Sequence, residues 1–296
     1  MALRQIKSSV FRNVQVSCRV EAENGSSTTK TMKIDQKFTL AEKVTFLSRP
    51  QSYSHRPSDV AVKETHMSWV FLAGERVYKL KKPVSYPFLD FTTLEARHKN
   101  CCEEVRLNAR LAGGIYLGAI PLNATYAGEL SLDLPGTPVD WLVCMKRLPA
   151  ARMLDELIAA SAGNSLDVNP AAAKLMRFYL AAPPLDVQAD WVIARFAAEH
   201  GQDARVLSDG RFDLDTVRTR RTLERMRAAL EHIGPLLQRR AAEKVYVEGH
   251  GDLRPEHVCL TAEPAFIDCL EFNADLRVLD PFDEIAYLAL ECQRLD

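Results

Sequence analysis

The sequence lacks any apolar stretch near the roughly 20 residues that a membrane-crossing helix needs, which argues against a membrane protein. Net charge is also nearly absent, at −1, so no overall field attracts nucleic acid or a membrane surface. The seven cysteines are odd in number and form no C-x-x-C pair, which disfavours a disulfide framework and a zinc site. We therefore expect a cytoplasmic protein with reduced thiols whose partners include neither nucleic acid nor membrane.

Composition and length indicate a globular protein with a distinct N-terminal segment. Hydrophobic residues make up 47% of the 296 residues and charged residues 26%, which suits one large bilobal domain or two packed lobes. Residues 1–40 are polar and rich in Ser, Thr and Lys, so we expect a flexible N-terminal extension. A targeting presequence is the alternative, because the first twenty residues carry four basic side chains and no acidic one.

The periodicity of apolar residues changes along the chain. After a helix expected at 41–50, β-type runs occur at 60–62, 69–72, 76–81, 115–120, 130–134 and 141–145, with one helix at 94–111. Helical patterns then dominate at 153–160, 171–180, 187–200 and 216–244. Short strands at 245–247, 258–260 and 265–268 and a last helix at 281–293 follow. The sequence therefore predicts an α+β protein, β-rich first and helical afterwards.

One segment carries the strongest chemical signal. It reads His250-Gly-Asp252-Leu-Arg254-Pro-Glu-His257, and eleven residues later comes Asp268 within Ile-Asp-Cys. Phosphoryl transfer needs a carboxylate beside the acceptor hydroxyl and ligands for the magnesium on the nucleotide phosphates. Asp252 and a metal ligand five residues later can face one cleft, and a tight hairpin can return Asp268 to the same metal.

This segment resembles the catalytic loop of the aminoglycoside phosphotransferase family, HGDxxxxN followed by an Ile-Asp pair, and the protein-kinase loop HRDxxxxN followed by DFG. The resemblance implies that Asp252 is the catalytic aspartate and that His257 and Asp268 bind the metal. Arg254 takes the place where protein kinases often carry a Lys near the transferred phosphate. The resemblance implies Mg²⁺ as the metal. His257 departs from the usual Asn, and imidazole prefers softer ions than magnesium, so Mn²⁺ is an alternative.

The start of the last predicted helix extends the resemblance. The run Asp-Pro-Phe-Asp-Glu-Ile-Ala at 280–286 is similar to the DPxxDLA motif of the family. Glu284 falls where the family has Asp, which implies that it braces the backbone of the catalytic loop. We interpret His250 in the same way, as a structural support of the loop and not as a base.

The N-terminal half carries matching nucleotide-binding candidates. Val-Tyr-Lys79 resembles the V-x-K strand whose Lys grips the α- and β-phosphates, and Glu104 is its expected partner, with Glu103 as the alternative. Lys81 and Lys82 compete with Lys79, and strand alternation places Lys79 and Lys81 on one face.

Two further contacts with the nucleotide are implied. Met145 and Arg147 would belong to a hinge that contacts adenine through its backbone. No G-x-G-x-x-G loop precedes the Lys strand, so the segment 65–68, which ends at Ser68, would cover the phosphates instead.

The resemblance implies a bilobal, protein-kinase-like fold. We expect a β-rich N-lobe and hinge at 41–149 and a mainly helical C-lobe at 150–296. The sequences of the segments Thr65–Leu72 and Lys79–Val84 resemble those of an uncharacterised bacterial branch of this family. Members of that branch often continue into a C-terminal P-loop domain. The sequence has no GxxxxGK[ST] motif, so we expect the kinase-like part alone, with such a domain as a candidate partner.

The function implied is an ATP- and magnesium-dependent phosphotransferase (kinase) that moves the γ-phosphoryl group to a hydroxyl of a small-molecule acceptor, which the sequence does not identify. A nucleotide-binding pseudokinase is an alternative, motivated by His257. A protein Ser/Thr kinase, a nucleotidyltransferase on the same fold and a structural scaffold are others. The arginine-rich stretch 218–244 indicates a solvated helix face; if it borders the cleft, it favours an anionic acceptor.

Overall fold

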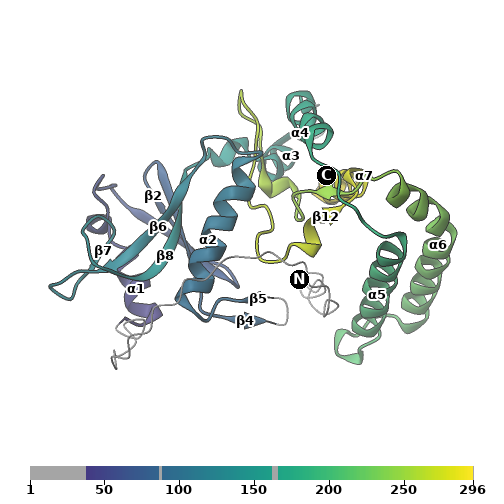
Figure 1. Cartoon of the computed structure of the whole chain (residues 1–296), viewed down its shortest axis with the longest axis horizontal. Coiled ribbons are helices and arrows are strands. Elements are labelled where there is room, and N and C mark those ends of the chain that lie inside the picture. Colours follow the sequence, from purple (N-terminus) through teal and green to yellow (C-terminus); the bar gives the residue numbers. More distant parts are fainter. Residues whose placement is uncertain (1–37, 87–88, 162–165, 296) are drawn as a thin grey trace.

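A computed structural model describes residues 38–86, 89–161 and 166–295 of the chain. The expected N-terminal extension at 1–40 lies outside the described residues except for its last three positions. The elements form a β-rich part followed along the chain by a helix-rich part, which lie side by side in Figure 1. The α+β class predicted from the sequence is thus confirmed.

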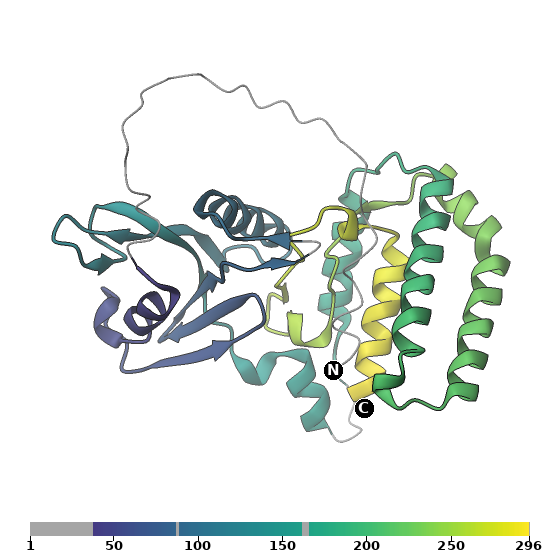
Figure 2. The ribbon, with the colours of Figure 1, turned by 90° about the horizontal axis from the view of Figure 1, so that it is seen from below.

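The β-rich part is built on a six-stranded antiparallel sheet in the order β1-β2-β3-β8-β6-β7. Its strands are β1 (Val60–Glu64), β2 (Ser68–Ala73), β3 (Arg76–Lys81), β6 (Tyr116–Ala124), β7 (Leu130–Ser131) and β8 (Thr137–Lys146). Helix α1 (Leu40–Leu47) and helix α2 (Leu94–Ala109) lie on opposite sides of this sheet in Figure 2. The sheet places β3 in its interior, between β2 and β8.

Strand alternation divides the side chains of β3 between two environments. Tyr78 and Leu80 are buried in a core that includes Leu47 of α1, Phe71 and Leu142. The side chains of Lys79 and Lys81 alternate with these two and point to the other face of the sheet. That face is the one that helix α2 covers, since α2 packs against β6 and β8.

The helix-rich part contains α3 (Leu154–Ser161), α4 (Asn169–Ala181), α5 (Ala189–Leu207), α6 (Thr216–Ala242) and α7 (Pro281–Leu295). Two small antiparallel pairs lie among them: β10 (Val258–Cys259) with β11 (Ala265–Phe266), and β9 (Val247–Glu248) with β12 (Val278–Leu279). Leu253, Val258 and Phe266 share one buried cluster with side chains of α3 and α4. The loop that carries Asp252 therefore rests on a packed core.

The arginine-rich helix α6 forms an antiparallel hairpin with α5 at the outer edge of the helix-rich part (Figures 1 and 2). Several of its arginines pair with acids along the same helix or nearby, as Arg227 does with Glu231 and Arg240 with Asp280. This placement, away from the β-sheet, fits a solvated face, and the hypothesis of an anionic acceptor stays a prediction.

Most helices and strands lie within a few residues of their predicted bounds, and the exceptions have physical causes. The pair β4 (Ser85–Tyr86) and β5 (Leu89–Asp90) was not predicted, because Pro83 and Pro87 make this segment read as a loop. Strand β12 was not predicted either, since two residues are too few to show alternation. Within the described residues, no helix combines the length and apolarity that would let it cross a membrane.

A buried charge cluster fixes α1 and α2 to the sheet. Asp140 on β8 accepts from Lys43 of α1 at 2.8 Å and from Arg97 of α2 at 2.7 Å. All three side chains are at most 6% exposed. Removing the carboxylate charge would leave two buried cations without compensation.

We therefore predict that Asp140→Asn lowers the free energy of unfolding by about 3–5 kcal/mol, the usual cost of breaking a buried ion pair. Denaturant unfolding monitored by circular dichroism measures this. Glu231→Gln is the matched control, because Glu231 is 65% exposed in its pair with Arg227; its effect should stay within about 0.5 kcal/mol. Equal effects of the two substitutions would contradict the role of the cluster.

Candidate functional site

Asp252, His257 and Asp268 lie together at the junction of the β-rich and helix-rich parts. The Nδ1 atom of His257 lies 2.7 Å from the backbone carbonyl of Asp252, and its Nε2 atom lies 3.7 Å from Oδ2 of Asp268. A carbonyl oxygen only accepts hydrogen bonds, so Nδ1 of His257 donates to it. The other ring nitrogen, Nε2, therefore faces the carboxylate of Asp268.

Asp268 follows the β10–β11 hairpin in a left-handed backbone conformation, with φ of +60°. Such a conformation costs a residue other than Gly roughly 1–2 kcal/mol and persists only where the surroundings enforce it. The Asp268 amide donates to the Tyr116 hydroxyl at 3.1 Å, and the next amide, of Cys269, donates to Oδ1 of Asn108 at 2.9 Å. These contacts aim a carboxylate that is 45% exposed into the site.

The loop that carries Asp252 is held from behind by Glu284 at the start of α7. Its carboxylate accepts the backbone N–H of His250 at 3.0 Å and that of Gly251 at 2.5 Å, and it also accepts from the Tyr179 hydroxyl. Gly251 has a φ of +84°, and an added Cβ would meet Arg277 and Leu270 at 3.1 and 3.2 Å. The structure therefore places Glu284 where a brace of the loop backbone was predicted.

His250 is fully buried and supports the loop as a neutral ring. Its Nε2 lies 2.9 Å from the carbonyl of Ile267, which fixes the proton on Nε2 and leaves Nδ1 to accept the Asp252 amide at 3.4 Å. Burial, and then the neighbouring His257, lower the pKa of His250 to about 3. The ring therefore stays uncharged at neutral pH and links the loop to the residue before Asp268.

Two lysines of β3 meet one buried carboxylate of α2. Nζ of Lys79 lies 3.0 Å from Oε1 of Glu104 and 2.6 Å from Oδ1 of Asp268. Nζ of Lys81 lies 2.5 Å from Oε2 of Glu104 and 2.5 Å from Oε1 of Glu271. Burial alone would lower the pKa of the Lys79 ammonium, but Asp268 and Glu104 raise it well above its usual value. Lys79 is thus charged, and its partner is Glu104 and not the alternative, Glu103.

Other predicted residues are already engaged elsewhere. The Arg254 guanidinium lies 2.6 Å from Glu256 and 3.8 Å from Glu291 of α7, so it is ion paired with acids and its predicted contact with a phosphate stays a prediction. Ser68 is buried at the start of β2, where its amide donates to the Thr65 hydroxyl at 2.9 Å and closes the β1–β2 turn.

The predicted hinge is also part of the sheet. Met145 lies within β8 and pairs with Val77 on one side and Tyr116 on the other. The Arg147 amide donates to the carbonyl of Glu75 at 2.8 Å. An adenine hydrogen bond to this amide would therefore require the contact with Glu75 to open.

Sequence reasoning missed Tyr116, Asn108 and Glu271 and ranked Lys81 below Lys79. Alternation did place Lys81 on the correct face, but nothing in the sequence assigned it a carboxylate partner. Tyr116 and Asn108 meet Asp268 and its neighbour across 152 and 161 residues of chain, and no local pattern marks them.

The donor set suits a metal that arrives together with other ligands. Among the described residues, no group of three or more His, Cys, Asp or Glu side chains could hold a metal on its own. The pair of His257 Nε2 and Asp268 Oδ2 offers one nitrogen and one oxygen donor. Magnesium bound to a nucleotide commonly takes only one or two protein ligands, with phosphates and water completing the shell. The two residues thus fit a nucleotide-borne divalent ion.

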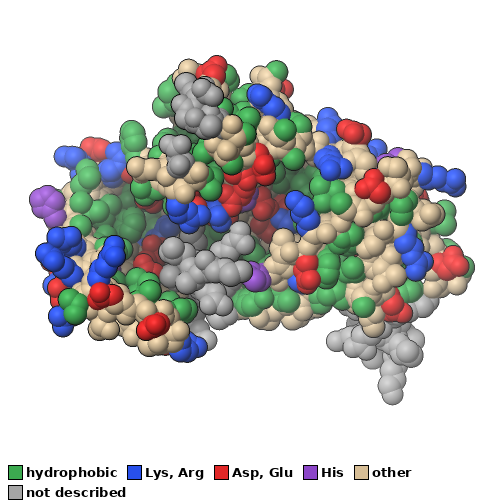
Figure 3. Space-filling view, turned by 180° about the vertical axis from the view of Figure 1, so that it is seen from behind, with side chains coloured by type: hydrophobic (Ala, Val, Ile, Leu, Met, Phe, Trp, Pro, Cys, Tyr) green, Lys and Arg blue, Asp and Glu red, His purple; other side chains and the backbone are tan. Residues whose placement is uncertain are grey.

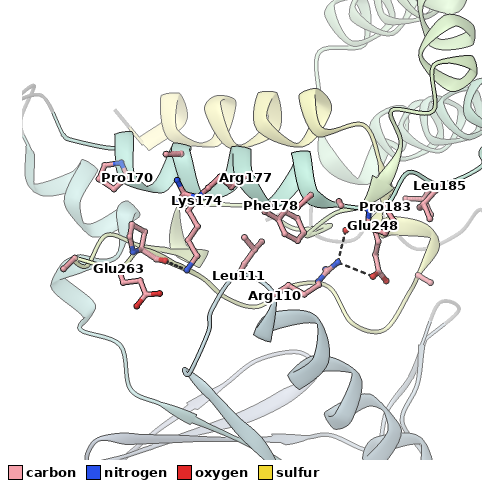
Figure 4. A pocket seen from close by; sticks show the side chains of 17 residues that line it. Arg110, Leu111, Pro170, Lys174, Arg177, Phe178, Pro183, Leu185, Glu248 and Glu263 are labelled. Carbon is pink, nitrogen blue, oxygen red and sulfur yellow. Dashed lines mark hydrogen bonds and ion pairs between the residues drawn. The ribbon is translucent and has the colours of Figure 1, made fainter.

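A separate groove of about 1200 Å³ runs along α4 (Figure 4). Arg110, Leu111, Phe178 and Glu248 are among the residues that line it, and Asp252, His257 and Asp268 are not among them. In the space-filling view, acidic side chains gather near the middle of the molecule, beside Lys and Arg side chains (Figure 3). The groove and the candidate site are distinct features.

No protein-family model matches the chain. Curated proteins of Mycobacterium tuberculosis, from strains H37Rv and CDC 1551, and of Mycobacterium bovis are each 33% identical to it over 241 residues, and each is described as uncharacterised. The match covers 80% of this chain and 46% of each relative. The chain therefore spans about half the length of the curated relatives it matches.

The neutral state of His250 makes stability depend on pH. The ordinary pKa of 6.5 applies to the unfolded chain, and the folded value is about 3. As pH falls through this window the unfolded chain binds a proton at His250 that the folded chain does not, so stability drops by up to about 1.4 kcal/mol per pH unit.

We predict that His250→Gln, whose amide can still donate to Ile267, is less stable than wild type at neutral pH. The difference in the free energy of unfolding between wild type and variant should become smaller as pH falls from about 6.5 toward about 4.5, because the variant lacks this proton linkage. Urea unfolding across that pH range measures both curves. Parallel curves would show that His250 is not held neutral in the fold.

Proposed function

We propose that the chain is a kinase-like phosphotransferase that moves the γ-phosphoryl group of ATP to a hydroxyl of a small molecule. One observation carries this proposal: the Lys79–Glu104 pair from the β-rich part meets Asp268 and His257 from the helix-rich part, next to the loop that bears Asp252. Phosphoryl transfer is catalysed mainly by positioning and charge stabilisation, and this cluster collects the Lys79 cation, two candidate metal ligands and the carboxylate of Asp252.

Each residue has a role in this proposal that its position supports. Lys79 binds the α- and β-phosphates, since its charged ammonium reaches the site from an interior strand. Asp252, whose side chain is 33% exposed, orients the acceptor hydroxyl and helps to remove its proton. Glu284 and His250 keep the Asp252 loop in place. The kinase-like bilobal arrangement and the nucleotide are parts of the same proposal.

His257 and Asp268 would hold the divalent ion of the nucleotide. When bound, that ion supplies charge neutralisation and orientation of the phosphates. The imidazole donor of His257 favours ions softer than magnesium, so Mn²⁺ is expected to bind at least as well as Mg²⁺. Asp268 must release Lys79 to take this role, because Oδ1 lies 2.6 Å from the ammonium.

A nucleotide-binding module without transfer activity is the second candidate. His257 stands where the phosphotransferases that the sequence resembles carry an Asn, and this substitution favours the second candidate. The relatives extend beyond the matched region, which covers 46% of each, so a further domain such as a P-loop domain has room there. We propose that such a domain acts together with the phosphotransferase.

The proposal predicts that ATP with Mg²⁺ or Mn²⁺ raises the melting temperature of the wild-type protein and that Asp268→Ala removes this shift. A ligand at 100 times its dissociation constant stabilises the folded state by about 2.7 kcal/mol. Differential scanning fluorimetry measures the shift with nucleotide alone, metal alone and both.

Asp186→Ala is the control, because Asp186 is 78% exposed and pairs with Lys244. It should keep the full shift. The absence of any shift in the wild type with either metal would overturn the proposal. A shift that Asp268→Ala retains would withdraw the metal-binding role of Asp268.

A further inference from the structure

The second lysine of β3 is more deeply buried than the proposed phosphate ligand. The side chain of Lys81 is 1% exposed, against 14% for Lys79. Its ammonium lies between Glu104 and Glu271 and 5.3 Å from the centre of the Phe91 ring. A charge this deeply buried persists only when it is paired on several sides.

The two lysines divide Glu104 between them. Lys79 contacts Oε1 and Lys81 contacts Oε2, and the Glu104 side chain is 0% exposed. Each lysine then reaches a different acid of the segment after β11, Lys79 reaching Asp268 and Lys81 reaching Glu271. The two lysines of β3 therefore form two parallel bridges. Each bridge joins Glu104 of α2 to the segment that carries the candidate metal ligand.

The lysines and acids of this cluster are unequal in number when each is counted with its formal charge. Two ammonium groups face three carboxylates, which leaves a net charge of −1 for the cluster. If Lys79 exchanges Asp268 for a phosphate, Asp268 loses this ammonium partner, and a divalent cation can take its place. Lys81 on Oε2 shares the charge of Glu104 in that state, so Lys79 does not have to neutralise Glu104 alone.

We propose that Lys81 is a positioning residue that keeps Glu104 and the Asp268–Glu271 segment in place while Lys79 exchanges Asp268 for a nucleotide phosphate. This inference rests on the proposed function. Without Lys81, the buried Glu104 carboxylate depends on Lys79 alone, which draws the Lys79 ammonium toward Glu104 and away from a phosphate. A purely structural Lys81 would affect folding and leave the encounter of Lys79 with nucleotide unchanged.

The test uses an acyl-phosphate analogue of ATP, which transfers its acyl group to a lysine amine near the phosphates and releases the nucleotide. The acylated lysine is identified and quantified by mass spectrometry in the full chain with Mn²⁺. Lys79 should be acylated in the wild type, and excess ATP should suppress the reaction. In Lys81→Met, acylation of Lys79 should fall at least about tenfold, which corresponds to about 1.4 kcal/mol.

Asp140→Asn is the matched variant, since it breaks another buried ion pair of the β-rich part, with Lys43 and Arg97, and leaves the partners of Lys79 and Lys81 in place. It should lower the melting temperature without ligand, yet keep acylation of Lys79 within about twofold of wild type. The double variant Lys81→Met with Glu271→Met replaces the buried pair by apolar side chains and should fold. It should still show the low acylation of Lys81→Met.

Other results would distinguish a failure of the inference about Lys81 from a failure of the proposed function. Unchanged acylation of Lys79 in a folded Lys81→Met or double variant would overturn the inference and leave the proposed function standing. Acylation of Lys81 in place of Lys79 in the wild type would also overturn it. A wild-type protein that shows no acylation suppressed by ATP would overturn the proposed function and the inference with it.

Discussion

The candidate site depends on one buried carboxylate, that of Glu104. Its side chain is fully buried between two lysines of β3, and it has no access to water that could solvate its charge. Because an unpaired buried carboxylate is costly, Glu104 fixes the position of both ammonium groups and holds α2 against the sheet. The position of Lys79, and through it the contact with Asp268, follows from this constraint.

The helix-rich part is held to the same frame by its backbone. Asn108, one turn after Glu104, accepts the Cys269 amide at 2.9 Å, and Arg110 donates to the carbonyls of Glu248 and Gly249. Glu284 then fixes the loop that follows Gly249. Glu104 and Asn108 of α2, and Arg110 directly after it, thus contact the lysine pair, the Asp268 segment and the start of the Asp252 loop. The parts proposed to bind phosphate, metal and acceptor are therefore all held by this helix and its C-terminal end.

The sequence predicted what depends on short-range patterns and missed what depends on distant contacts. Asp252, His257 and Asp268 were predicted because the motif they resemble lies within a short stretch of chain, so its spacing can be recognised from the sequence. The pairing of Lys81 with Glu271 spans 190 residues, and that of Tyr116 with Asp268 spans 152, so no local periodicity reveals them. The hinge expectation for Arg147 ignored that its amide completes a pairing with Glu75, which only the folded sheet specifies.

The most direct test of the account is whether His257 and Asp268 hold the metal of a nucleotide. Electron spin echo envelope modulation of Mn²⁺ bound with ATP to the wild-type protein detects nitrogen nuclei in the coordination shell. The account predicts an imidazole nitrogen coupling that appears only with nucleotide and disappears in His257→Asn. A spectrum without nitrogen coupling, or a coupling that His257→Asn leaves unchanged, would contradict the assignment of this site.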